Sequence, residues 1–155
     1  MIPGIIAWRR AAVPTGVVWN PADKSESISL NVAGDIASYM TGGSRHIVRA
    51  VTPKSTGKWY FESFVEYGAG GGPITDQFGI SICDATVPIS PASVNAVGNK
   101  FFYLANGQTF RSNSYLGVRS TYTSGDTIGV ALDASSGAVW ISKNGAWLNS
   151  GNPAG

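Results

Sequence analysis

Hydrophobic and polar positions alternate along much of this chain, with the two-residue period of a β-strand. Residues 27–32 (SISLNV) place three apolar side chains on one face, namely Ile28, Leu30 and Val32. The turn signal Gly34-Asp35 follows, and residues 36–40 (IASYM) are the expected partner strand. No segment of ten residues carries the 3.6-residue period of an amphipathic helix. The pattern therefore predicts an all-β protein.

The strongest alternation lies in residues 58–67 (KWYFESFVEY). One face of this strand would carry Trp59, Phe61, Val65 and Tyr67, and the other would carry Lys58, Tyr60, Glu62, Phe64 and Glu66. Because the second face mixes charged and aromatic side chains, we expect it to be only partly covered.

The C-terminal region, residues 125–147 (GDTIGVALDASSGAVWISKNGAW), reads as a regular hairpin followed by another strand. Its first strand would point Ile128, Val130 and Leu132 one way, and its return strand would place Val139 and Ile141 on one face and Trp140 on the other. Asn144-Gly145 and Asn106-Gly107 are favoured tight-turn sequences. Short strands that each end in a turn signal are typical of two packed antiparallel sheets.

The composition fits one globular domain and narrows the classes of partner. The chain has 155 residues, 20 glycines and only 13% charged residues. Its net charge is +2 and its basic residues are scattered, so no basic stripe could neutralise a nucleic-acid backbone. The N-terminal apolar run is shorter than a membrane helix, and its arginines follow it instead of preceding it as in a secretory signal. Cys83 lies in an apolar alternating run, where we expect a buried structural thiol.

The sequence contains no recognisable catalytic motif. His46 is the only histidine and has no cluster of carboxylates near it in sequence, so we expect a structural or surface role. Residues 68–73 (GAGGGP) lack the Lys-Ser/Thr ending of a phosphate-binding loop. No GxSxG motif is present. We therefore predict no catalytic residues, no metal and no cofactor.

The carboxylates fit a framework better than an active site. Glu62 and Glu66 share one strand face with their backbones about 13 Å apart, which is too far for a glycosidase pair. Asp126 and Asp133 flank a strand and suit turn positions.

The remaining candidates for function are aromatic and polar residues expected near one rim of the sandwich. Tyrosine and arginine are enriched in binding hot spots because they combine large contact area with a polar end. The predicted binding residues are Tyr103, Arg111, Asn113, Tyr115, Arg119 and Tyr122. The alternative is that these tyrosines only cover the outer face of a sheet.

Two segments carry a resemblance to a known family. GKWYFES at 57–63 and GDTIGVALDASSGAVWISKNG at 125–145 are similar to the strand and hairpin motifs of SPRY domains, and the likeness extends from Val17 to Asn152. The resemblance implies an antiparallel two-sheet β-sandwich of the concanavalin-like jelly-roll type over residues 13–155, preceded by an N-terminal arm at 1–12. It implies binding through loops at one edge of the sandwich and no enzymatic activity.

The ending KNGAWLNSGNPAG resembles SPRY domains of bacteriophage and prophage proteins. This implies a virion structural or adhesion protein, in a fibre, tail or capsid decoration. Its partners would be other virion proteins, or a glycan or protein of the host surface. We expect no nucleic-acid partner and no membrane insertion. The protein would assemble as a homo-oligomer such as a trimer. Two alternatives are an intracellular SPRY-type interaction adaptor and a glycan-cleaving enzyme on a similar sandwich.

The resemblance also brings one departure, because family members usually continue beyond the NPAG-type loop with at least one more core strand. A missing strand would uncover apolar side chains and unpaired backbone groups at a sheet edge. Either the sequence is a piece of a longer chain, or another chain fills the gap by strand addition.

Overall fold

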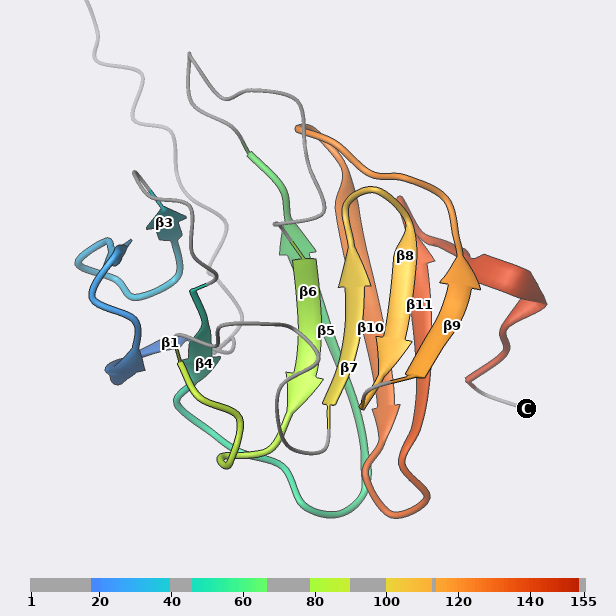
Figure 1. Cartoon of the computed structure of the whole chain (residues 1–155), viewed down its shortest axis with the longest axis horizontal. Coiled ribbons are helices and arrows are strands. Elements are labelled where there is room, and N and C mark those ends of the chain that lie inside the picture. Colours follow the sequence, from blue (N-terminus) through green and yellow to red (C-terminus); the bar gives the residue numbers. More distant parts are fainter. Residues whose placement is uncertain (1–17, 40–45, 67–78, 90–99, 113, 154–155) are drawn as a thin grey trace, which may run out of the picture.

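The computed structural model describes residues 18–39, 46–66, 79–89, 100–112 and 114–153 (Figure 1). The predicted N-terminal arm, residues 1–12, lies outside the described residues, as does the glycine-rich segment 68–73. The described part contains antiparallel β-strands, one short 3-10 helix, η1 (Leu148–Ser150), and no α-helix. The all-β prediction is confirmed.

The first sheet has the strand order β12-β11-β10-β5. Its members are β5 (Lys58–Phe64), β10 (Thr127–Asp133), β11 (Ala138–Lys143) and β12 (Ala146–Trp147). Strands β5 and β10 pair without a register shift, so that Phe61 lies opposite Val130 and Lys58 opposite Asp133. The two segments that carry the SPRY resemblance are therefore neighbours in one sheet.

The second sheet has the order β6-β7-β8-β9. It is formed by β6 (Gly79–Cys83), β7 (Lys100–Leu104), β8 (Gln108–Arg111) and β9 (Ser114–Val118). The β7–β8 hairpin predicted around Asn106-Gly107 is confirmed. Strand β9 lies at the start of residues 114–126, a segment whose composition indicates a polar connection with room for a short strand.

The two sheets lie one in front of the other and enclose the core between them (Figure 1). Val65, Ile128, Val130 and Ile141 from the first sheet region pack with Tyr103 and Ala105 from the second, and Phe61, Ile80 and Val139 border this cluster. The predicted inward faces are therefore confirmed for Phe61, Val65, Ile128, Val130, Val139 and Ile141. Trp59, predicted on the same face, is 42% exposed, because it lies near the start of β5, where its indole nitrogen donates to the Thr56 carbonyl. Tyr67 lies outside the described residues. The antiparallel two-sheet β-sandwich is the architecture of this domain.

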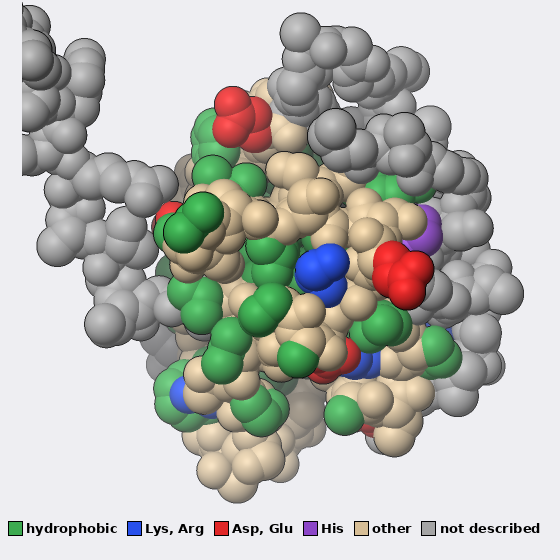
Figure 2. All heavy atoms as spheres, turned by 90° about the vertical axis from the view of Figure 1, so that its left-hand side faces the viewer, with side chains coloured by type: hydrophobic (Ala, Val, Ile, Leu, Met, Phe, Trp, Pro, Cys, Tyr) green, Lys and Arg blue, Asp and Glu red, His purple; other side chains and the backbone are tan. Residues whose placement is uncertain are grey.

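A smaller N-terminal region lies beside the sandwich and faces the viewer in Figure 2. It consists of two strand pairs, β1 (Trp19–Lys24) with β4 (Val48–Ala50) and β2 (Ile28–Leu30) with β3 (Ala37–Tyr39). Arg49 ties β4 to β1 through an ion pair with Asp23 at 2.6 Å. It also donates to the Val87 carbonyl in the segment after β6.

The predicted pairing of residues 27–32 with 36–40 is confirmed in part. Ile28 is buried and lies opposite Tyr39. Strand β2 ends at Leu30, however, and Val32 is fully exposed, so its predicted place on the apolar face is wrong. The chain has already entered the turn at Val32, where strand alternation no longer applies.

Candidate functional site

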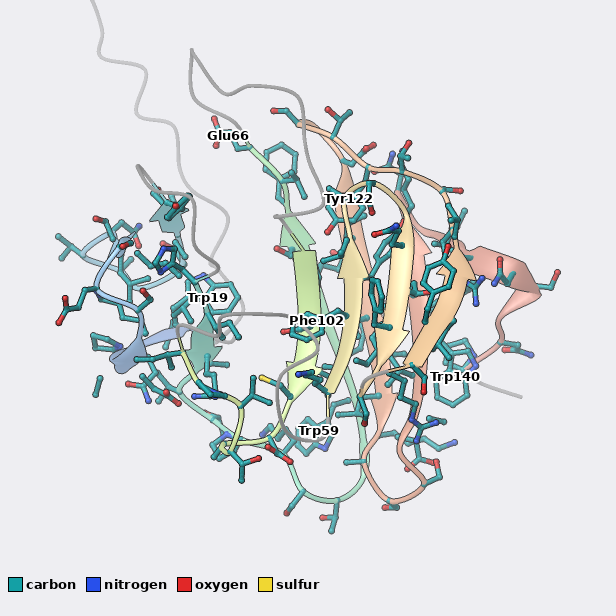
Figure 3. All side chains as sticks on the ribbon, in the orientation of Figure 1. Trp19, Trp59, Glu66, Phe102, Tyr122 and Trp140 are labelled. Atoms are coloured by element: carbon teal, nitrogen blue, oxygen red, sulfur yellow. The ribbon has the colours of Figure 1, made fainter. Side chains whose placement is uncertain are left out.

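Two of the predicted binding tyrosines belong to the core. Tyr103 on β7 is 0% exposed and Tyr122 is 2% exposed, and their rings lie 4.8 Å apart. Figure 3 labels Tyr122. The expectation that they are exposed on the rim is wrong, because the alternation of β7 points Tyr103 inward. Their position leaves them no surface with which to meet a large partner directly.

The buried tyrosines anchor the segment that follows β9. The Tyr122 hydroxyl donates to the Tyr103 carbonyl at 2.9 Å, and the Tyr122 N–H donates to the Ala105 carbonyl at 3.0 Å. The Tyr103 hydroxyl donates to the Ser120 carbonyl. Burial first, and the nearby charge of Asp126 second, raise the pKa of Tyr103 to about 12, so the hydroxyl keeps its proton and its role as a donor.

Two further contacts fix the shape of β9. The Thr109 hydroxyl donates to the Gly117 carbonyl at 2.9 Å, beside a register shift between β8 and β9. At the end of β9 the Arg119 N–H donates to the Gly107 carbonyl at 2.7 Å, which ties the strand to the β7–β8 turn. The shift is a β-bulge, because Thr109 pairs with Gly117 and Phe110 pairs with Tyr115, which leaves Leu116 as the extra residue.

This framework presents three exposed apolar side chains close together in sequence on β9, which we name the β9 patch: Tyr115, Leu116 and Val118. These side chains are 55%, 44% and 59% exposed, respectively. The Tyr115 ring rests on Phe110 of the neighbouring strand, with the ring centroids 5.4 Å apart. Large apolar residues that stay exposed next to one another on one strand are a feature of interaction surfaces.

The structure separates the two predicted arginines. Arg111 is exposed at the hairpin end of β8, where its Nη2 lies 3.6 Å from the ideal Cβ position of Gly137 in the β10–β11 turn. Arg119 is half-buried beyond the other end of β9, opposite Gly107 and about 13 Å away at the usual rise per strand residue. Its Nε donates to the Asn149 side-chain oxygen at 2.6 Å in the amide orientation that satisfies both groups.

Of the six predicted binding residues, Tyr115 and Arg119 thus border one surface, Arg111 lies apart, and Asn113 lies outside the described residues. Whether any of them binds a partner stays a prediction. Sequence reasoning missed Leu116 and Val118, although residues 114–118 (SYLGV) were an apolar run and could have been read as a strand.

The acidic residues predicted at turns do lie at turns. Asp126 accepts from the Thr123 N–H and from Asn144 Nδ2, each at 2.8 Å, and forms an ion pair with Lys143 at 3.0 Å. These contacts, that of Asn144 first, lower the pKa of the Asp126 carboxyl. Asp133 accepts from the backbone N–H groups of the turn after β10, which lowers its pKa as well.

Other potentially reactive groups have framework contacts. The Ser25 hydroxyl lies 2.5 Å from His46 Nδ1, and the His46 ring packs 5.0 Å from Tyr39, so His46, just before β4, contacts the β1–β2 connection and the end of β3. Cys83 is a half-buried free thiol on β6. Among the described residues, no three His, Cys, Asp or Glu side chains gather closely enough to hold a metal ion. Nor does this part of the chain contain a helix of the length and hydropathy needed to cross a membrane.

Comparison with known proteins gives a distant likeness. No protein-family model matches the chain. The chain is 28% identical over 147 residues to the dual specificity protein kinase splA of Dictyostelium discoideum, an alignment that covers 91% of this chain and 6% of that protein. The chain therefore spans a small part of that protein. It is an all-β sandwich domain with a distant likeness to a short region of a much longer kinase.

Proposed function

We propose that this chain is a non-enzymatic, SPRY-type binding module that holds a partner protein against the β9 patch. The single observation that carries the proposal is the exposure of Tyr115, Leu116 and Val118 on a strand held by buried anchors. A rigid scaffold that presents an apolar surface loses little conformational entropy when it binds. The SPRY-like motifs support the family assignment, since they form β5 and the β10–β11 hairpin of one sheet.

The chemistry of the patch favours a protein over a glycan. Aromatic faces stack on sugar rings, and Tyr115 could act in this way. Leu116 and Val118, however, offer aliphatic area without hydrogen-bonding groups, which suits apolar protein side chains better than hydroxyl-rich sugars. The arginine beside the patch adds a polar rim.

The likeness to a kinase supports a binding role better than a catalytic one. The sequence has no HRD or DFG motif, and its glycine-rich segment 68–73 lacks the kinase loop pattern. We infer that the matched region of the kinase is a module outside its catalytic machinery, and that this chain corresponds to such a module.

The biological setting belongs to the proposal as well. The ending at residues 143–155 resembles phage SPRY domains and supports a virion protein, whereas the likeness to a signalling kinase supports an intracellular adaptor. Peptide mass spectrometry of purified phage particles discriminates the two. Stoichiometric recovery of this chain from particles supports the virion setting, and its absence from them supports the adaptor.

The binding proposal is tested on protein and glycan arrays probed with the purified chain. The informative variant combines Tyr115→Ala with Val118→Ser, and the control is Val32→Ser, which changes an exposed valine in the N-terminal region. Surface substitutions of this kind change the free energy of unfolding by about 0.5 kcal/mol or less, so folding is retained. We expect hits on the protein array that the control keeps and the double variant loses.

Two results would contradict the assignment. A double variant that keeps all protein hits would show that the β9 patch is not the binding surface. Glycan hits that depend on Tyr115 and Val118, without protein hits, would assign the surface to carbohydrate.

A further inference from the structure

The outer edge of β5 has the properties of a docking site for an extended peptide. Strand β5 is seven residues long, contains no proline and pairs with β10 without a bulge. It is the last strand of its sheet, and no described strand pairs with its other side. We propose that this open edge binds an extended segment of another polypeptide by strand addition. This inference goes beyond the β9 patch, which lies on the other sheet.

Hydrogen bonds at both ends of β5 show which backbone groups are available. The Val65 N–H donates to the Asp126 carbonyl, and the Gly125 N–H donates to the Val65 carbonyl, each at 2.9 Å. At the other end the Ala134 N–H donates to the Gly57 carbonyl at 2.9 Å. Backbone groups alternate sides along a strand, so odd-numbered residues face β10. The N–H and C=O groups that face the open edge are those of Lys58, Tyr60, Glu62 and Phe64.

This edge lacks the protection that the edges formed by β12 and β9 have. Natural sheets discourage pairing with foreign strands by making edge strands short or bulged. Strand β12 is only two residues long, and β9 contains the bulge at Leu116. Strand β5 has neither feature, and Tyr60 and Phe64 remain 52% and 64% exposed.

The side chains of β5 define the chemistry of the occupant. Tyr60, Glu62 and Phe64 alternate along the outward face, and the Tyr60 hydroxyl donates to Glu62 Oε1 at 2.7 Å. Directly opposed side chains in paired strands prefer aromatic or β-branched partners for aromatics, and opposite charges. The fitting segment therefore has apolar residues opposite Tyr60 and Phe64 and an Arg or Lys between them, opposite Glu62.

A nine-residue peptide with the sequence Ser-Thr-Val-Thr-Arg-Val-Tyr-Thr-Ser serves as the probe. In antiparallel addition its third, fifth and seventh residues oppose Phe64, Glu62 and Tyr60. We expect saturable binding by isothermal titration calorimetry. Because the chain carries a net charge of +2, general charge attraction does not favour this cationic peptide.

N-methylation of the peptide separates strand addition from adhesion of side chains. Methyl groups on the fifth and seventh amides block the hydrogen bonds to β5, whereas methyl groups on the fourth and sixth amides point away from β5. Loss of two such bonds weakens binding about tenfold or more, and the second peptide should bind like the parent. Equal weakening by both modifications, or no binding of the parent peptide, overturns the proposal.

A charge reversal fixes the register. Glu62→Lys should weaken binding of the parent peptide and strengthen binding of a peptide with Glu at its fifth position. The control Glu66→Lys changes an exposed acid just beyond the strand and should leave both affinities as in the wild type (Figure 3). Equal responses to the two variants overturn the assigned register.

Two further measurements distinguish peptide binding at the β5 edge from binding at the β9 patch and from self-association. The β9 double variant should bind the peptide like the wild type, so failure of the β9 proposal leaves this one intact. Sedimentation equilibrium of the chain alone should show no association that depends on Glu62. If Glu62→Lys abolishes self-association, the occupant is a second copy and the proposal of a different polypeptide is wrong.

Discussion

Replacement of Gly107 by alanine should destabilise the domain far more than the same change at another glycine of similar conformation. Gly107 has φ +87°, in the region that side chains disfavour. An added Cβ would lie 2.3 Å from the Arg119 carbonyl oxygen and 3.0 Å from Val118 Cγ1. The first neighbour is backbone, and the Arg119 N–H also donates to Gly107, so relief of the collision must pull Arg119 away from the turn.

Gly125 provides the matched control for this prediction. Its φ is +92°, and an added Cβ would meet nothing within 4 Å. Gly125→Ala should therefore cost only the unfavourable backbone conformation, about 1–2 kcal/mol of unfolding free energy. Gly107→Ala should cost that amount plus about 1–2 kcal/mol for the broken hydrogen bond and the displaced carbonyl. The expected total for Gly107→Ala is about 2–4 kcal/mol.

Urea unfolding followed by tryptophan fluorescence measures both variants. For a domain of this size each kcal/mol also lowers the melting temperature by about 2–4 °C. Equal losses of free energy for the two variants, with unchanged m-values, would refute the close approach of the β7–β8 turn to Arg119. The β7–β8 turn would then not be an anchor of β9.

Three further predictions concern the same framework. The pKa of the Asp126 carboxyl is lowered from its ordinary value of 3.8, so the stability that this carboxylate contributes is complete above pH 3.8 and is lost as the pH falls below it. The unfolding free energy of Asp126→Asn should therefore change less with pH in this acid range than that of the wild type. The pKa of Tyr103 in the folded protein is raised to about 12 from 10.0, so the stability that this tyrosine contributes is lost as the pH rises between these two values. Absorbance titration at 295 nm should show one tyrosine that ionises at higher pH than the others, and Tyr103→Phe should remove that signal. Thr109→Val removes the hydrogen bond to Gly117 and should cost about 1 kcal/mol of unfolding free energy in urea melts, and a cost near zero would show that this bond does not hold the bulge.

Strand β5 was predictable because it has one covered face and one open face. The inward side chains of Phe61, on β5, and of Val65, directly after it, alternate with exposed Tyr60, Glu62 and Phe64, and the sequence shows this period directly. The turn at Asn144-Gly145 was equally clear, since both residues have positive φ, of 50° and 81°, and this pair of residues favours that conformation.

The candidate site was harder to predict for a physical reason that concerns both faces of β7. Tyr103 points into the core, but Phe102 and Leu104 on the opposite face are also only 6% and 4% exposed. A strand covered on both sides has no alternation to show which residues point inward. On β9 the bulge at Leu116 shifts the alternation by one residue, so the exposed face cannot be extrapolated along the strand.

The β5 and β9 edges of the sandwich should therefore bind in different ways. The bulge in β9 disturbs the regular spacing of backbone groups, so a partner there must recognise the side chains Tyr115, Leu116 and Val118. Strand β5 keeps its spacing, so a partner there can bind backbone to backbone, with Glu62 selecting its charge. Truncation of side chains should consequently abolish binding at β9, whereas at β5 it should change which peptide is preferred and leave the affinity that the backbone provides.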